Sequence, residues 1–191
     1  PYMHLKMKKV TYNADFALYV TEKYLQNRYP CANPSINASN VLIKTVDDEV
    51  LRKRLNKISA MPLDVKEITE MTTASIDLLS KGQRYVVRAM GELKNKGIIV
   101  KYHLVGGGKK EHLISEAEKA GVKDQLVFKG ELTLDEVYQE LDKIDIYIQP
   151  SLQEGLPRAV IEAMSRACPC IGANTAGIPE LLDDECIAKR H

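Results

Sequence analysis

The sequence predicts an α/β protein built on a doubly wound parallel sheet. From Ile68 onward, short apolar stretches rich in β-branched residues alternate with longer stretches that have helical periodicity. This order is typical of strands and crossover helices repeated along a parallel sheet. The 191 residues suffice for one domain with a sizeable core and a small appendage.

The first part of the chain is expected to hold short elements separated by polar loops. Brief apolar stretches mark the elements, and Gly, Pro, Asn and Ser mark the loops between them. The expected elements are strands at 16–20 and 41–43, helices at 22–29 and 51–58 (the second exposed), and a loop at 30–39. The chain begins with Pro1 rather than Met, as we expect of an excised or processed fragment.

The remainder is expected to alternate strands with helices. Strands are predicted at 68–74, 100–105, 126–128, 144–148 and 170–172, and helices at 83–95, 110–120, 134–141, 156–167 and 178–182. Ligands of parallel α/β sheets bind at the carboxyl ends of the strands. That rule places four loops on one rim of the sheet, at 74–81, 106–109, 128–131 and 149–157.

The most informative of these loops, together with the helix that follows it, contains two glutamates. Glu154 lies in the loop Glu154-Gly-Leu-Pro, and Glu162 lies a turn or so into the helix that follows. Pro157 suits a first helical position, where its missing N–H costs nothing. Free backbone N–H groups at a helix start attract a phosphate, and a nearby carboxylate accepts hydrogen bonds from hydroxyls. A phosphate together with hydroxyls describes a sugar nucleotide.

The segment from Glu154 to Glu162 resembles the Glu-x7-Glu signature of retaining glycosyltransferases of the GT-B fold, family 4. The sequence Leu-Pro-Arg-Ala inside it is similar to that of family members that build bacterial surface polysaccharides such as capsules. The resemblance extends from around Thr72 to the end of the chain. Its motifs occur in family order: Lys81-Gly82, Gly106-Gly-Gly108, Val127-Phe-Lys-Gly130, the glutamate pair and Gly177-Ile-Pro-Glu180, of which the last is expected to be structural.

The resemblance implies a role for each residue of the glutamate loop. Glu162 is expected to bind the ribose hydroxyls of the nucleotide. Glu154 is expected to act as the catalytic carboxylate, stabilising a developing oxocarbenium charge on the donor sugar by electrostatics rather than by proton transfer. The amides of Gly155 and Leu156 are expected to hydrogen-bond the sugar or the phosphate.

Two of these charged residues also have plain structural explanations. Glu162 lies four residues from Arg158 and four from Arg166, a spacing that allows a surface salt-bridge ladder. Lys81 could be an ordinary exposed lysine.

Lys81, followed by a glycine, resembles the phosphate-binding lysine of the family. There the lysine neutralises the donor diphosphate together with an arginine five or six residues earlier, but here those positions are Ile76 and Ser75. Either Arg84 or Arg88 substitutes from the following helix, or diphosphate binds with one cation fewer. The loss of a bidentate guanidinium is not a neutral change.

Two further segments resemble donor contacts. Gly107 lies in a glycine turn that allows the backbone to approach a ligand closely, and Phe128 and Lys129 resemble the segment whose backbone reads the base. The glycine turn lacks the G-x-G-x-x-G spacing and the acidic ribose ligand of a dinucleotide site. A dinucleotide-dependent oxidoreductase is therefore a distant alternative.

Composition and motifs limit the classes of partner and the cellular compartment that we expect. The net charge of +1 gives no overall attraction to nucleic acid. No apolar stretch approaches the length of a transmembrane helix, and no signal peptide is recognisable, so we expect a cytoplasmic location and four reduced cysteines. No His pair has metal-ligand spacing and no Asp-x-Asp occurs, so neither a metal nor another cofactor is expected, in agreement with the resemblance.

These features predict the donor-binding half of a GT-B glycosyltransferase. Residues 1–43 are expected to end an N-terminal acceptor domain and link it to a nucleotide-sugar domain at 44–191, cut short at its C-terminus. The full enzyme is expected to move a hexosyl unit from a nucleoside diphosphate sugar to a polysaccharide or lipid-linked acceptor with retention. Peripheral contact with the inner face of the plasma membrane is expected through the missing domain. The alternatives are a GT-B nucleotide-sugar epimerase and a non-catalytic scaffold that has lost donor binding.

Overall fold

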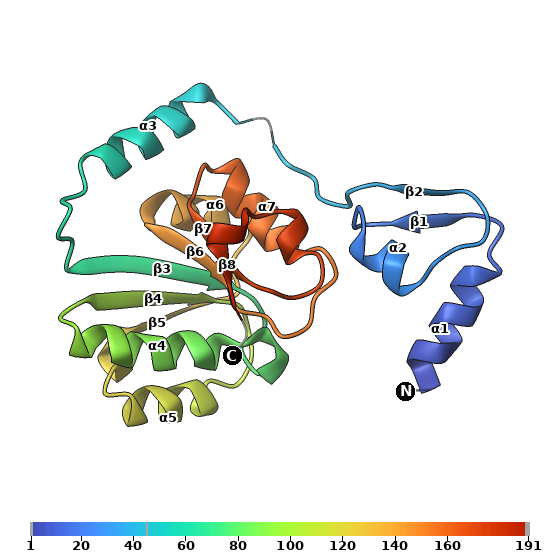
Figure 1. The fold of residues 1–191 in the computed structure, drawn as a ribbon. Coiled ribbons are helices and arrows are strands. Elements are labelled where there is room, and N and C mark those ends of the chain that lie inside the picture. The colour runs from blue at the N-terminus through green and yellow to red at the C-terminus, as the bar shows by residue number, and fades with distance from the viewer. Residues whose placement is uncertain (1, 45, 190–191) are drawn as a thin grey trace.

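A six-stranded sheet forms the larger unit of the computed structural model, which describes residues 2–44 and 46–189 (Figure 1). All neighbouring strands run parallel, in the order β5-β4-β3-β6-β7-β8. The strand order reverses between β3 and β6, as in a doubly wound sheet. This confirms the predicted fold class. The strands are β3 (Glu67–Thr73), β4 (Ile99–Val105), β5 (Leu126–Gly130), β6 (Ile146–Gln149), β7 (Cys170–Ala173) and β8 (Ile187–Ala188).

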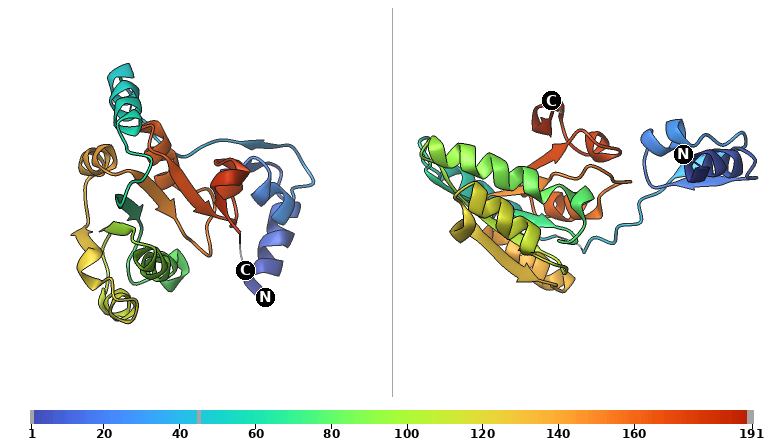
Figure 2. Two further views of the ribbon diagram at one scale, coloured as in Figure 1. Left: turned by 60° about the vertical axis from the view of Figure 1, so that its left-hand side comes forward. Right: turned by 90° about the horizontal axis from the view of Figure 1, so that it is seen from below.

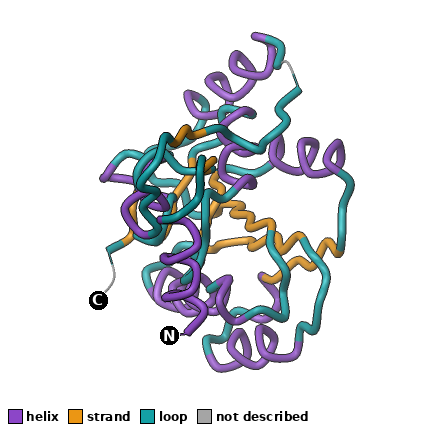
Figure 3. Tube along the Cα trace, turned by 90° about the vertical axis from the view of Figure 1, so that its right-hand side faces the viewer, coloured by secondary structure: helices purple, strands orange, loops and turns teal. Residues whose placement is uncertain are grey.

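Helices lie on both sides of this sheet (Figure 3). Two of them bury Val87, Met90 and Leu113 in one core cluster, and the other two bury Leu141 and Val160 in a second cluster. Apolar residues recur on one face of each helix, so each helix covers the sheet with that face. The first pair is α4 (Gln83–Asn95) and α5 (Glu111–Lys119), and the second is α6 (Leu134–Lys143) and α7 (Arg158–Ser165).

Two tyrosines place polar groups inside these cores. Tyr102 is fully buried, and its hydroxyl donates to Thr72 Oγ1 at 2.7 Å. Tyr147 is also fully buried, and its hydroxyl donates to Gln149 Oε1 at 2.9 Å. Buried hydroxyls cost free energy unless they find partners, and these bonds supply the partners.

A smaller unit precedes the sheet (Figure 2). It contains α1 (Tyr2–Tyr12), β1 (Ala17–Tyr19), α2 (Tyr24–Arg28) and β2 (Ser35–Asn37), with β1 and β2 paired in parallel. The strand expected at 16–20 and the helix expected at 22–29 are present in shortened form. The prediction of a loop at 30–39 is wrong at β2. All three side chains of this strand are exposed, so the sequence shows no alternation of apolar and polar residues there.

The strand expected at 41–43 is also wrong. Those residues pair with no strand in the described part of the chain, although they are apolar. The division at residue 43 stays a prediction, and residues 1, 45, 190 and 191, which fall within its two ranges, lie outside the described residues.

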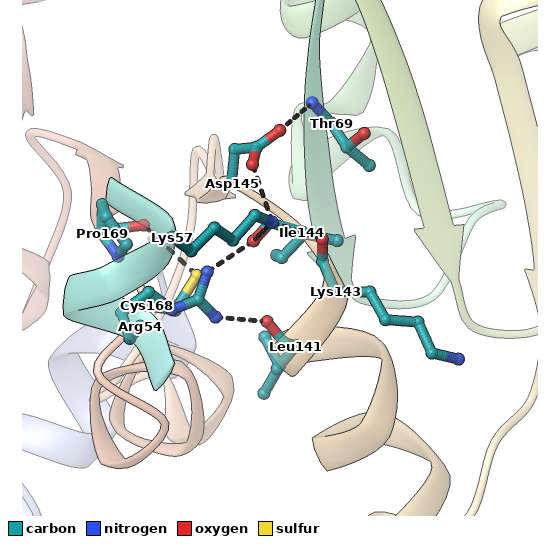
Figure 4. Close-up of polar contacts among 9 residues, drawn as sticks. All are labelled: Arg54, Lys57, Thr69, Leu141, Lys143, Ile144, Asp145, Cys168 and Pro169. Carbon is teal, nitrogen blue, oxygen red and sulfur yellow. Dashed lines mark hydrogen bonds and ion pairs between the residues drawn. The ribbon is translucent and has the colours of Figure 1, made fainter. Parts of the chain in front are cut away.

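Helix α3 (Asp48–Ser59) connects the two units and is fixed to the end of α6 by a buried arginine (Figure 4). Leu51 and Leu55 are exposed, as expected for this helix, but Arg54 is only 4% exposed. Its guanidinium donates to Leu141 O at 2.6 Å and to Ile144 O at 2.5 Å. The last carbonyls of a helix have no partner within it, so Arg54 satisfies two of them.

Lys57 strengthens the same junction. Its ammonium group donates to Ile144 O at 2.9 Å and pairs with Asp145 Oδ1 at 2.7 Å. The other oxygen of Asp145 accepts from Thr69 N at 2.7 Å, so α3, the end of α6 and the start of β3 share one polar network (Figure 4).

The remaining predicted elements agree with the structure to within two residues at each end, apart from the last helix. Residues 178–182 were expected to be helical, but only a 3-10 turn, η3 (Ile178–Glu180), forms there. Helix α7 begins at Arg158, which leaves Pro157 as its N-cap rather than its first residue. Strand β8 was not predicted, because two residues are too few to show a pattern.

Candidate functional site

The candidate site lies where β3 and β6 run side by side. The helices that follow these two strands pack on opposite faces of the sheet. In parallel α/β sheets the carboxyl ends of the strands at such a point border the ligand-binding crevice. The loops leaving the two strands are tied together there, because Leu152 N donates to Ser80 O at 2.7 Å. The predicted loops 74–81 and 149–157 therefore meet.

Lys81 and Glu154 form an ion pair inside this crevice. Lys81 Nζ lies 2.7 Å from Glu154 Oε1, and the side chains are 25% and 11% exposed, respectively. Gln149 Nε2 donates to the same carboxylate oxygen at 3.1 Å. Lys81 is thus not an ordinary exposed lysine, and two predicted site residues from separate loops come together.

Gln149 is a site residue that the sequence analysis missed. It is 2% exposed, and its amide also donates to Ser151 Oγ at 2.9 Å while its carbonyl accepts from Tyr147. A chain of hydrogen bonds therefore runs from the core to Glu154. One signal was available, because Tyr147 and Gln149 are polar residues two apart near the carboxyl end of a strand and so share a face.

Gly82 shapes the turn after Lys81. Its φ of +76° lies in the left-handed region, and a Cβ there would stand 2.0 Å from Pro150 O. Only glycine fits, so the Lys81 loop can approach the Glu154 loop this closely. Gly107 lies on the same rim, where a Cβ would meet Glu131 Oε1 at 2.4 Å.

Gly155 and Leu156 present backbone to the crevice. Neither amide donates a hydrogen bond to any group in residues 2–44 or 46–189, and nothing lies within 4 Å of where a Cβ would stand on Gly155. No side chain caps the first turn of α7. The loop therefore offers unpaired donors, which favour an anion.

Glu162 is partly buried in α7, and burial raises the pKa of its carboxyl group while Arg158 opposes that rise. The salt-bridge ladder considered for it does not form. Arg166 instead pairs with Asp142, with Nε to Oδ1 at 2.8 Å and Nη2 to Oδ2 at 2.5 Å. Within the described chain Glu162 has no ion-pair partner, so its carboxylate is available to a ligand.

The two candidate phosphate arginines are placed differently. Arg88 Nε donates to Glu116 Oε2 at 2.7 Å, so this side chain is directed to α5 and away from the crevice. Arg84 is nearer than Arg88 to Lys81 in the sequence. Its Nε is buried and has no hydrogen-bond partner in the part of the chain described. Ile76 is fully buried in the core, and Ser75 Oγ donates to Asp77. The Arg84 guanidinium lies 5.1 Å from the centre of the Tyr85 ring, and its Nη2 donates to the Tyr85 hydroxyl at 3.3 Å. A phosphate contact from Arg84 therefore stays a prediction.

Phe128 and Lys129 lie on β5, away from the ion pair. Lys110 Nζ stands 4.9 Å from the centre of the Phe128 ring, and Lys129 Nζ lies 2.9 Å from Glu140 Oε2. Both side chains are therefore engaged within the protein. A contact between this segment's backbone and a base stays a prediction.

The described residues contain neither a metal-binding cluster nor a membrane-spanning helix. In residues 2–44 and 46–189, no three His, Cys, Asp or Glu side chains cluster in a way that could hold a metal ion. No helix in those ranges is both long and apolar enough to cross a membrane. The four cysteines form no disulfide in the structure.

Known proteins are similar to this chain in sequence and in fold. The family model described as Glycosyl transferases group 1 matches residues 77–187, more than half of the chain. Protein CapJ of Staphylococcus aureus is 29% identical over 191 residues, covering 98% of this chain and 46% of CapJ. The amylovoran biosynthesis glycosyltransferase AmsK of Erwinia amylovora is 28% identical over 151 residues, covering 75% of this chain and 36% of AmsK. The structure of Anabaena HepE in complex with UDP and glucose has a TM-score of 0.69 at 17% identity, covering 94% of this chain and 50% of HepE.

Proposed function

Because the chain belongs to the glycosyl transferases group 1 family, we propose that it is the donor-binding part of a polysaccharide-building enzyme. The enzyme would move a hexosyl unit from a nucleoside diphosphate sugar to a polysaccharide or lipid-linked acceptor, with retention at the anomeric carbon. The observation that carries the proposal is the meeting of Lys81 and Glu154 at the switch point of the sheet. The chain spans less than half the length of CapJ and of AmsK, and we expect no turnover by this chain alone.

The donor would bind through five residues of the candidate site. Lys81 and Arg84 would neutralise the diphosphate, and the free amides of Gly155 and Leu156 would hydrogen-bond it or the sugar. Glu162 would accept hydrogen bonds from the ribose hydroxyls. HepE, of the same fold, has been solved with UDP and glucose, which supports this class of ligand.

The ion pair gives Lys81 and Glu154 linked roles. In the structure each neutralises the other. A bound diphosphate would compete for Lys81, because a phosphate oxygen is an equally good partner for an ammonium group. Glu154 would then be held by Gln149 alone and would turn its charge toward the sugar, where it stabilises positive charge at the reacting carbon.

Calorimetric titration with UDP, GDP and ADP tests the proposal. One nucleotide should bind saturably, and Glu162→Ala should weaken that binding by at least about tenfold, because the ribose loses hydrogen bonds to a charged acceptor. Glu185→Ala is the matched control, since Glu185 is exposed and forms no ion pair with the described residues. Excess EDTA should leave the affinity unchanged, since we propose that no metal takes part.

The alternatives give different results in the same experiments. Absence of binding to all three nucleotides by a folded sample would contradict the proposal and favour a scaffold without donor affinity. A nucleotide-sugar epimerase would bind a nucleotide too, but the full-length protein would convert its donor without an acceptor. A transferase leaves the glycosyl unit on the acceptor with its configuration retained.

A further inference from the structure

Glu180 joins two parts of the protein that are far apart in sequence. Its carboxylate accepts hydrogen bonds from three consecutive backbone amides, those of Glu22 at 2.6 Å, Lys23 at 3.2 Å and Tyr24 at 2.6 Å. These amides precede or begin α2, where helix geometry leaves N–H groups without partners. Hydrogen bonds to an ionised acceptor are roughly twice as strong as neutral ones.

The other end of the same segment touches the candidate site. Gly177 N donates to Gly155 O at 2.9 Å, in the loop that carries Glu154. A Cβ on Gly177 would stand 2.7 Å from Gly155 O and 3.0 Å from Thr21 Cγ2. Gly177 to Glu180 therefore contacts the site loop on one side and the turn before α2 on the other.

We propose that Glu180 is a positioning residue that holds the smaller unit, residues 2–44, in a fixed orientation against the loop of Glu154. Three consecutive backbone amides, from Glu22 to Tyr24, make the contact on the smaller unit. The only ion pair between the two units in the described chain joins the exposed side chains of Lys44 and Asp135. Exposed pairs contribute little, so the orientation depends on Glu180.

The consequence for transfer rests on the proposed function. If the loop of Glu154 holds the donor sugar, Glu180 sets where the acceptor side of the enzyme stands relative to that sugar. A misplacement of about 1 Å between reacting groups can cost on the order of a hundredfold in rate. A residue that touches neither substrate would thereby control the reaction through geometry.

Nuclear magnetic resonance on the 191-residue chain tests the proposal through two readouts. In Glu180→Gln, the amides of Glu22, Lys23 and Tyr24 should exchange with solvent at least about tenfold faster, because charge-assisted hydrogen bonds are lost. Residual dipolar couplings should then require separate alignment tensors for residues 2–44 and for the sheet, where the wild type requires one. Glu185→Gln, an exposed neighbour, should change neither.

Two results would overturn the proposal. Unchanged exchange at the three amides would show that the carboxylate does not hold them. Faster exchange with a single, unchanged alignment tensor would reduce Glu180 to a local cap of α2. The nucleotide titration of the wild type is independent of both readouts, so a failure of donor binding would leave the positioning role standing.

Discussion

Lys81 Nζ and Glu154 Oε1 lie 2.7 Å apart although the two residues are 73 positions apart in the chain. Strands β3 and β6 are neighbours in the sheet, and the loop after each delivers one of the two charges. The pair is largely shielded from solvent, so its electrostatic coupling is stronger than that of a surface pair.

A double-mutant cycle should measure this coupling. Lys81→Met should lower the free energy of unfolding by about 1 kcal/mol, because it leaves the Glu154 carboxylate with one neutral hydrogen-bond donor. Lys81→Met combined with Glu154→Gln should cost less than the sum of the single variants. Urea unfolding of the four proteins supplies the numbers. Strict additivity would show that the two groups do not interact in solution.

Glu70 should make stability depend on pH. It is 6% exposed on β3 and borders a largely apolar groove of about 790 Å³ beside α4, and burial raises the pKa of its carboxyl from 4.5 to about 7. The folded state therefore keeps a proton that the unfolded chain releases between these values. The stability that this proton contributes is fully present below pH 4.5 and is lost as pH rises through about 7.

Glu70→Gln removes the carboxyl group that holds this proton, so the variant should not lose stability as the pH rises. Relative to the wild type, the variant should gain roughly 3 kcal/mol of unfolding free energy between the acid and alkaline ends of this window. Glu67→Gln, at a more exposed position of the same strand, should gain much less. Urea unfolding measured across this pH range tests the prediction. Parallel profiles of unfolding free energy against pH for Glu70→Gln and the wild type would contradict the raised pKa of Glu70.

Two glycines with the same backbone conformation should respond differently to alanine. Gly82 has φ +76° and Gly97 has φ +78°, but a Cβ meets Pro150 O at 2.0 Å only on Gly82. Gly97→Ala should cost about 1 kcal/mol, the strain of a left-handed residue. Gly82→Ala should cost at least about 2 kcal/mol more, because backbone must move. Equal melting temperatures for the two variants would mean that the loops of Lys81 and Glu154 are not in contact.

Arg54 should contribute far more to the free energy of unfolding than its neighbour Arg52. Arg54→Met takes the donor from Leu141 O and leaves Ile144 O with Lys57 alone, so it should lower the free energy of unfolding by about 2 to 4 kcal/mol. Arg52 is exposed and forms no ion pair in the described chain, so Arg52→Met should change the free energy by less than about 0.5 kcal/mol. Similar denaturation midpoints for the two variants would argue against the buried contact.

Most of the larger unit could be predicted because its strands and helices have strong periodic patterns. Helix α4 was predicted with both ends correct, and its buried Val86, Val87 and Met90 show why, since they form one apolar face. The smaller unit was harder. Helix α1 buries no residue and so has no apolar face to detect, and β2 exposes all its side chains.

The site could be predicted only as a set of loops. The rule for parallel sheets brought the segments of Lys81 and Glu154 to one rim, but no pattern in the sequence specifies a contact between side chains 73 positions apart. Gln149 was missed because a polar residue at a strand end is not unusual by itself. Glu180 was taken as structural, and the amides that it binds lie 156 or more positions away.

Chemical-shift mapping of nucleotide binding tests the central claim most directly. With saturating UDP, GDP or ADP, whichever binds, the largest amide shifts should fall on Lys81, Gly155 and Leu156, with smaller changes around Glu162. Amides in the sheet interior and in the groove beside α4 should move little. Shifts concentrated elsewhere, or none with any of the three nucleotides, would contradict the assignment of this crevice as a donor site.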